Sequence, residues 1–238
     1  YAEGARAFTY WIALEIDKEL SHPDEAVRAE AADMVALLTP IIKAFITDNA
    51  FECTNHGVQV YGGHGFIAEW GMEQYVRDAR ITQIYEGTNG VQALDLLGRK
   101  ILSDMNAKMK AFGEVVRVFV EDNGIDMKMQ EFVNPLADIA VKVEKLTMEI
   151  GMKAMANQDE VGAASVPYQR VVGHMVFSYF WARMAKVALE KENQDDFYKA
   201  KLATARFYFA KLLPETAGYI RQARAGNASL AEMQDDWF

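Results

Sequence analysis

Residues 59–66 read QVYGGHGF, and residues 77–92 read RDARITQIYEGTNGVQ. Three glycines within residues 62–65 allow the left-handed backbone that ends many helices, so a helix is expected to stop there. In the second stretch, Thr88 stands before a run of periodic apolar residues and is suited to cap a helix. The two stretches therefore predict two breaks between helices, and the second break presents a single carboxylate, Glu86.

Apolar residues recur at spacings of three and four through the rest of the chain, which is typical of amphipathic helices. Helices are expected over residues 1–20, 23–61, 72–79 and 88–122 and then, after a polar stretch at 122–131, from Asn134–Pro135, from Pro167 and over 197–225. No stretch alternates as a strand does. The chain is predicted to be all-α, with an antiparallel helical bundle over 1–122 followed by a second helical-bundle domain over 123–238.

Several boundaries carry more specific expectations. Ser21 is expected to cap the second helix, with Asp24 completing a capping box. Pro40 lacks an N–H and is expected to kink or split that helix near Leu37. The helix from Thr88 is expected to be continuous, residues 157–166 to form a loop, and Pro214 to kink the last long helix before Gly226 ends it.

Composition excludes several classes of protein. The 238 residues are 51% hydrophobic and carry a net charge of -9, which disfavours non-specific nucleic-acid binding because that requires a basic surface. No apolar run approaches the ~20 residues of a membrane span. The single cysteine, Cys53, rules out an internal disulfide and favours a reducing compartment. We therefore expect a cytoplasmic protein, or one of the mitochondrial matrix in a eukaryote.

Glu86 is the first candidate for chemistry. It lies between Tyr85 and Gly87, just before an expected helix start. A carboxylate on irregular backbone beside a glycine has space for a substrate, and desolvation would raise its pKa enough for proton abstraction. The same pattern also describes a solvated glutamate in a turn, and the residues by themselves leave both interpretations open.

Two further candidates are sites for anions. Backbone N–H groups in residues 59–65 could approach a phosphate, and the helix start at Thr88, Asn89 and Gly90 favours negative charge. A plain helix end explains the glycines equally well, and the pattern is not the G-x-G-x-x-G loop of a Rossmann fold. The four histidines lack ligand spacing, so no metal is expected.

The two motifs together, in this order and at this separation, resemble the C-terminal helical domain of the acyl-CoA dehydrogenases. The resemblance covers the chain to about Leu102. The second half, which ends in LLPETAGYIRQARAG at residues 212–226, resembles the extra C-terminal helical domain of one branch of that family. That branch includes enzymes that act on 3-methylthiopropanoyl-CoA.

The resemblance implies a flavoprotein of fatty acid metabolism that forms the α,β double bond of an acyl-CoA thioester. Glu86 would be the base that removes the α proton, and Tyr85 and Gly87 would contact the acyl-CoA. The residues expected to contact FAD are Thr88, Asn89 and Gly90, together with Gln59, Val60, Tyr61, Gly62 and Gly63. The second group would reach the FAD of a neighbouring subunit, which implies a homodimer or homotetramer, and an electron-transfer flavoprotein is the expected acceptor.

The resemblance also implies that the family's N-terminal helical domain and middle β domain lie outside this chain, and that the first helix here is truncated. Because those domains hold most of the flavin, the chain alone is predicted to be inactive and FAD is predicted to be absent from it or only partly bound. Two alternatives remain open. One is an acyl-CoA oxidase of the same fold, and the other is a non-catalytic helical oligomerisation module.

Overall fold

The structure is a computed structural model that describes residues 1–237. Within that range every regular element is helical, which confirms the predicted all-α class. The chain divides into two compact units, Tyr1–Leu96 and the remainder from Leu97. The boundary at 122–123, drawn from composition between two functional domains, stays a prediction.

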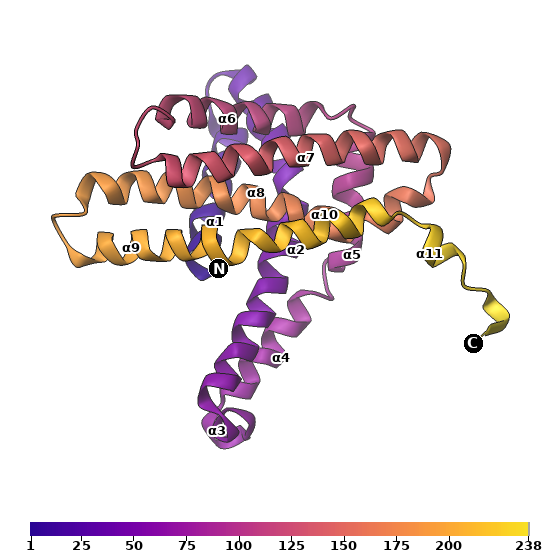
Figure 1. The fold of residues 1–238 in the computed structure, drawn as a ribbon, viewed down its shortest axis with the longest axis horizontal. Helices are drawn as coiled ribbons and strands as arrows, with labels where there is room; N and C mark the ends of the chain where they lie inside the picture. The colour runs from indigo at the N-terminus through magenta and orange to yellow at the C-terminus, as the bar shows by residue number, and fades with distance from the viewer. Residues whose placement is uncertain (238) are drawn as a thin grey trace. The chain divides into compact units, whose positions relative to one another are not determined.

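The first unit is organised around one long helix, α2 (Glu25–Tyr61), which packs against α1 (Ala2–Ser21) and α4 (Met72–Thr82). Figure 1 shows the short helix α3 (Gly63–Phe66) at the end of the hairpin that α2 and α4 form. A 3-10 turn, η1 (Ala68–Trp70), leads into α4, and α5 (Asn89–Leu94) returns to the middle of α2. The fully buried side chains of this unit include Phe8, Leu37, Leu38, Ile41 and Phe45.

Two expectations at α2 were wrong. Asp24, not Ser21, caps the helix, since its Oδ1 accepts a hydrogen bond from Ala26 N at 2.9 Å. Ser21 is the last residue of α1, so it is not on the extended backbone that a cap requires. Pro40 does not split the helix, which runs unbroken through it, and the kink expected there stays a prediction. Burial of the turn on each side of Pro40 outweighs the missing hydrogen bond.

The single helix expected over residues 88–122 is also interrupted. After α5 the backbone forms a π-helix, η2 (Asp95–Leu102), and then a break before α6 (Ala107–Asn123). Met105 and Asn106 in the break have positive φ values of 49° and 65°. Ile101 before the interruption and Met109 after it are buried, but Met105 within it is exposed. The apolar spacing of the sequence therefore continues through a break at which the side chain leaves the core.

The second unit is an antiparallel bundle. Its helices are α6, α7 (Gln130–Ala156), α8 (Asp159–Lys191) and a bent arm composed of α9 (Asp196–Phe207), η3 (Tyr208–Leu212), η4 (Leu213–Glu215) and α10 (Thr216–Ala225). These follow one another side by side in Figure 1, and the chain continues into α11 (Ala228–Ala231) and η5 (Asp235–Trp237). Every residue from 168 to 182 is buried, so α8 is the central helix of this unit.

Two helix starts that were predicted from prolines in this unit were wrong. α7 begins at Gln130, so Asn134 and Pro135 lie inside it, and α8 begins at Asp159, so residues 159–166 are helical and not a loop. The interruption at Pro214 is present, in the form of the π and 3-10 segments. Gly226 ends α10 as expected, at φ 72°. Its positive φ favours glycine at this position, and a Cβ there would meet only the mobile end of the Glu160 side chain.

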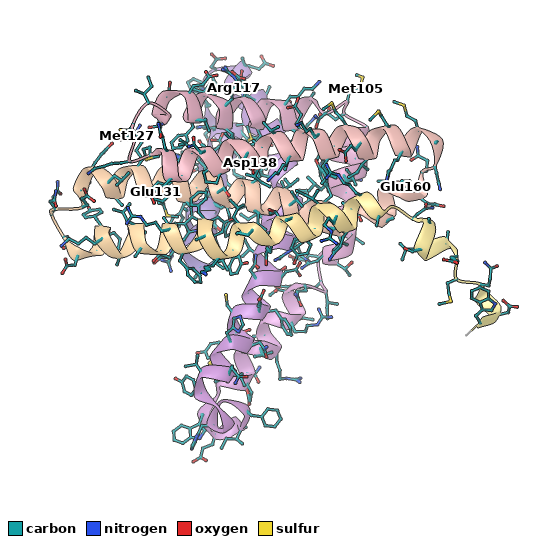
Figure 2. The ribbon with its side chains drawn as sticks, viewed as in Figure 1. Met105, Arg117, Met127, Glu131, Asp138 and Glu160 are labelled. Carbon is teal, nitrogen blue, oxygen red and sulfur yellow. The ribbon has the colours of Figure 1, made fainter. Side chains whose placement is uncertain are left out.

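Ion pairs join the bent arm to α7. Arg206 of α9 donates to both carboxylate oxygens of Glu131 at 2.8–3.0 Å, and Arg224 of α10 donates likewise to Glu149 at 2.6 and 2.9 Å. Figure 2 shows Glu131 near the start of α7 and Glu160 near the start of α8. These pairs are largely exposed, so they fix the register of the arm more than they stabilise it.

A buried polar cluster links the bend of the arm to α8. The fully buried ring of His174 hydrogen-bonds Glu215 through Nε2 and the hydroxyl of Tyr208 through Nδ1, the latter at 3.0 Å. Arg170 also donates to Glu215, at 3.2 Å. Burial lowers the pKa of His174, against the opposing charge of Glu215. Burial alone would raise the pKa of Glu215, but His174 and Arg170 hold it below its ordinary value.

This cluster predicts that acid destabilises the chain. The unfolded chain takes up protons at His174 and Glu215 at a higher pH than the folded chain does, so stability is full above the unfolded pKa values and is lost as the pH falls through them. The free energy of unfolding, measured with urea, is expected to fall by about 1 kcal/mol between about pH 7.5 and about pH 5. His174→Gln, which does not titrate, should show a shallower fall. An equal slope in both proteins would contradict this account.

Candidate functional site

Glu86 lies on the turn between α4 and α5, where the backbone is strained. Its φ is 54°, in the left-handed region that non-glycine residues rarely adopt, at a cost of about 1 kcal/mol or more. Gly87 follows with φ 85°, and a Cβ there would lie 2.6 Å from Nε2 of Gln92. That same Nε2 donates to the carbonyl of Glu86 at 3.2 Å. Gly87 is therefore required by the turn itself, whatever it contacts.

Asn89 anchors this turn to α2. Its side-chain Nδ2 donates to Asp48 Oδ1 at 2.6 Å and to Thr47 Oγ1 at 2.9 Å. Gln83, on the other side of Glu86, donates from Nε2 to the same Asp48 oxygen at 2.9 Å. The Asn89 backbone N–H also donates to the Gln83 carbonyl at 3.1 Å. One carboxylate thus holds both ends of the turn that presents Glu86.

Lys43 adds a third tie from α2. Its Nζ donates to the Gly87 carbonyl at 2.6 Å and to Asn89 Oδ1 at 2.8 Å. Desolvation lowers the pKa of Lys43, and the charges of Asp48 and Glu86 oppose that effect. Sequence reasoning missed Lys43, Asp48 and Gln83. The signal available was the polar group of Lys43, Thr47 and Asp48 directly after the apolar stretch at 41–42 and around residues 44–46.

The cap predicted at Thr88 is confirmed, with Oγ1 accepting from Val91 N at 3.4 Å. The side chain of Asn89 faces α2 and is fully occupied there, so it is the backbone near Gly90 that stays open to a ligand. Tyr85, Glu86 and Gly87 are exposed. Within the part of the chain that the structure describes, these three positions are therefore open to solvent, without the desolvation that a carboxylate base requires.

The first glycine segment forms an open cradle, the backbone of residues 59–63, at the C-terminal end of α2. Gly62 ends the helix at φ 61°, and its N–H donates to the Gln59 carbonyl at 3.1 Å. A Cβ on Gly62 or Gly63 would meet nothing within 4 Å, and Gln59, Val60 and Tyr61 are exposed. The bare backbone here fits the approach of a phosphate-bearing cofactor. Gly65 differs, because a Cβ there would lie 2.5 Å from the carbonyl oxygen of Val58.

Within one chain, the turn at residues 85–90 and the glycine segment at residues 59–63 do not lie next to each other. Asp48 marks the point on α2 where the Glu86 turn docks, and Gln59 comes eleven residues later along the same helix. At ~1.5 Å per residue the separation along the axis is roughly 17 Å. The structure therefore gathers Tyr85–Gly90 at one place and Gln59–Gly63 at another.

Neither a metal site nor a membrane span adds to this picture. Among the described residues, no three His, Cys, Asp or Glu side chains are grouped to hold a metal ion. In the same part of the chain, no helix has both the length and the apolar character needed to cross a membrane. The compartment expected from Cys53 stays a prediction.

The anchoring of the turn can be tested through Asn89. Asn89→Asp keeps the shape of the side chain but turns a donor toward Asp48 into a second carboxylate. The free energy of unfolding of the chain, measured with urea, is expected to fall by about 1–3 kcal/mol. Gly90→Ala is the matched control, since a Cβ there meets nothing within 4 Å and alanine favours the helix. Equal stability of the two variants would show that the Asn89–Asp48 bond does not hold the turn.

Comparison with known proteins extends the similarity over nearly the whole chain. The family model described as acetyl-CoA dehydrogenase C-terminal like matches residues 89–234, and the acyl-CoA dehydrogenase C-terminal domain matches residues 6–102. A 3-methylmercaptopropionyl-CoA dehydrogenase from Ruegeria pomeroyi is 34% identical over 237 residues, covering 96% of this chain and 40% of that protein. The broad-specificity linear acyl-CoA dehydrogenase FadE5 from Mycobacterium tuberculosis is 29% identical, covering 90% and 37%.

Solved structures agree on the fold. An acyl-CoA dehydrogenase from Bacillus anthracis, complexed with FAD, matches with a TM-score of 0.72 at 18% identity, over 98% of this chain and 41% of that one. ACDH-11 from Caenorhabditis elegans, in complex with C11-CoA, matches with a TM-score of 0.72 at 21% identity, over 87% and 33%. The chain spans about two fifths of the length of the curated relatives it matches.

Proposed function

Because the chain belongs to the acyl-CoA dehydrogenase family, we propose that it serves as the C-terminal helical part of an enzyme that introduces the α,β double bond into an acyl-CoA thioester. The observation that carries the proposal is the Glu86 turn. A single carboxylate stands on strained backbone beside a glycine and is tied to a long helix on both sides. Such strain is typical of functional sites.

In this proposal Glu86 is the base that removes the α proton. A C–H bond next to a thioester is a weak acid, so the carboxylate must be held at a fixed distance and shielded from water. The ties to Asp48 and Lys43 supply the first requirement. Tyr85 and Gly87 would lie against the acyl group, and parts of the protein beyond this chain would supply the shielding. The chain alone is accordingly proposed to be inactive.

FAD, when bound, would supply the acceptor for the hydride that leaves the β carbon. The residues proposed to contact it are Thr88 and Gly90 near the base, the backbone of Asn89, and the open cradle from Gln59 to Gly63. The bare backbone at Gly62 and Gly63 supports this role. An electron-transfer flavoprotein is the proposed electron acceptor.

The separation of about 17 Å along α2 supports a shared site. We propose that Gln59–Gly63 serves the cofactor of a neighbouring subunit while Tyr85–Gly90 serves the substrate of its own. The active protein would then be at least a homodimer, and a homotetramer is consistent with the same arrangement.

The activity is tested with the full-length protein carrying its FAD, without oxygen. Acyl-CoAs of graded chain length are expected to bleach the oxidised flavin band of the wild type. Glu86→Gln should slow bleaching by about 100-fold or more, because it removes the base but keeps the shape of the side chain. Glu30→Gln, at an exposed position on α2, should behave as the wild type. Unchanged bleaching by Glu86→Gln would contradict the assignment of the base.

The same experiment separates the alternatives. Peroxide formation on admitting air, as fast as turnover, would identify an acyl-CoA oxidase. If the wild type keeps its FAD but no thioester bleaches the flavin, the interpretation that remains is a non-catalytic helical module.

The shared site predicts complementation between two inactive variants. Glu86→Gln removes the base, and Gly62→Val places a branched side chain on backbone at φ 61° in the cradle. Refolding the two full-length variants together should restore activity, since the mixed dimer holds one site with neither change. Activity is measured by flavin bleaching against each variant refolded alone. An inactive mixture, or a full-length monomer with tightly bound FAD, would contradict a shared site.

A further inference from the structure

The direction in which Glu86 points depends on the backbone that follows it. Glu86 and Gly87 both have positive φ values, 54° and 85°, so the turn lies outside the conformations that its sequence favours by itself. Such a turn persists only where its surroundings hold it. The group that holds the carbonyl between Glu86 and the start of α5 is the ammonium of Lys43, which donates to the Gly87 carbonyl at 2.6 Å.

Lys43 is placed to act as a clamp. Its Nζ also donates to Asn89 Oδ1 at 2.8 Å, so one ammonium spans the turn from Gly87 to the anchoring amide. Its neighbours in the chain, Ala44 and Phe45, are buried in the core, so α2 is rigid at this point. The side chain is half-buried, and hydrogen bonds from a charged donor strengthen as water is excluded.

We infer that Lys43 is a positioning residue for the reaction. It fixes the Gly87 carbonyl and the Asn89 amide from α2, and so holds the Glu86 carboxylate at the place where the α proton must be taken. The inference rests on the proposed function. It differs from a purely structural role because Asp48 already docks both ends of the turn. Lys43 acts on the segment between those ends.

The geometry explains why a lysine suits this position. An ammonium has three donors and no acceptor, and two of the three point at the turn. The acidic groups whose charges act on Lys43 are Asp48 and Glu86. The cation therefore lies among the groups it organises, between the anchor and the base.

The test uses the full-length protein with FAD and follows flavin bleaching in single turnover. Lys43→Met keeps the length of the side chain and removes its donors. The rate of bleaching at saturating acyl-CoA should fall by about 10- to 100-fold, because small displacements of a base cost that much. FAD content and the Kd for the thioester should stay close to those of the wild type. Lys43→Arg, which keeps the charge and the donors, should recover most of the rate.

Two controls make the outcome decisive. Lys18→Met removes a lysine of the same unit that donates to Glu15, away from the turn, and should leave the rate unchanged. Glu86→Gln, in parallel, tests the proposed function itself. If Glu86→Gln abolishes bleaching and Lys43→Met does not slow it, the positioning role is wrong and the proposed function stands. If Lys43→Met keeps the wild-type rate of bleaching per bound FAD and only binds FAD or the thioester less tightly, Lys43 has a structural role. If Lys43→Met does not retain FAD, the bleaching rate of Lys43→Gln, which keeps a neutral donor, is compared with that of Lys43→Arg. Equal rates of bleaching in these two variants would overturn the inference.

Discussion

The carboxylate of Asp48 is the contact on which the site depends. A single oxygen accepts hydrogen bonds from Gln83 before the turn and from Asn89 after it. That contact acts together with the hydrogen bonds from Lys43 and Gln92 to keep Glu86 in the left-handed region, where its own side chain gives no benefit. The strain at Glu86 is therefore offset by polar contacts with α2, and α2 is held in turn by the apolar core of the first unit. The position of Glu86 therefore depends on apolar packing elsewhere in the first unit.

The glycines of the two motifs meet different physical needs, although they look alike in the sequence. Gly87 is favoured by its φ of 85°, and Gly65 is required because a Cβ there would lie 2.5 Å from the carbonyl oxygen of Val58. Gly62 and Gly63 face open space, so nothing in the chain itself demands small residues at both. Gly62 still gains from its positive φ, but Gly63 does not. Exposed glycine backbone that no contact within the described residues requires is suited to the approach of an external ligand.

Helical periodicity was sufficient to predict the fold class, and the glycines predicted the helix ends at Gly62 and Gly226. It failed where a local signal was read without its tertiary context. Pro40 and Pro135 lie inside helices because packing outweighs a single lost hydrogen bond. The break at Met105 and Asn106 was not predicted because Met105 continues the apolar spacing of the sequence, although its side chain is exposed in the structure. The site residues in the motifs could be proposed from sequence, but Lys43 and Asp48 lie about 40 residues earlier, and only folding shows that they meet the turn.

The exposure of Glu86 divides the requirements of a base into two. Direction and distance are set inside this chain, by contacts with Lys43, Asn89 and Asp48 that are complete within the first unit. Exclusion of water is not, because Tyr85, Glu86 and Gly87 all remain exposed. In the proposed enzyme, proton abstraction from carbon would also require that water be excluded from Glu86. Another surface would then have to cover the turn, and the contacts within this chain would already fix its backbone.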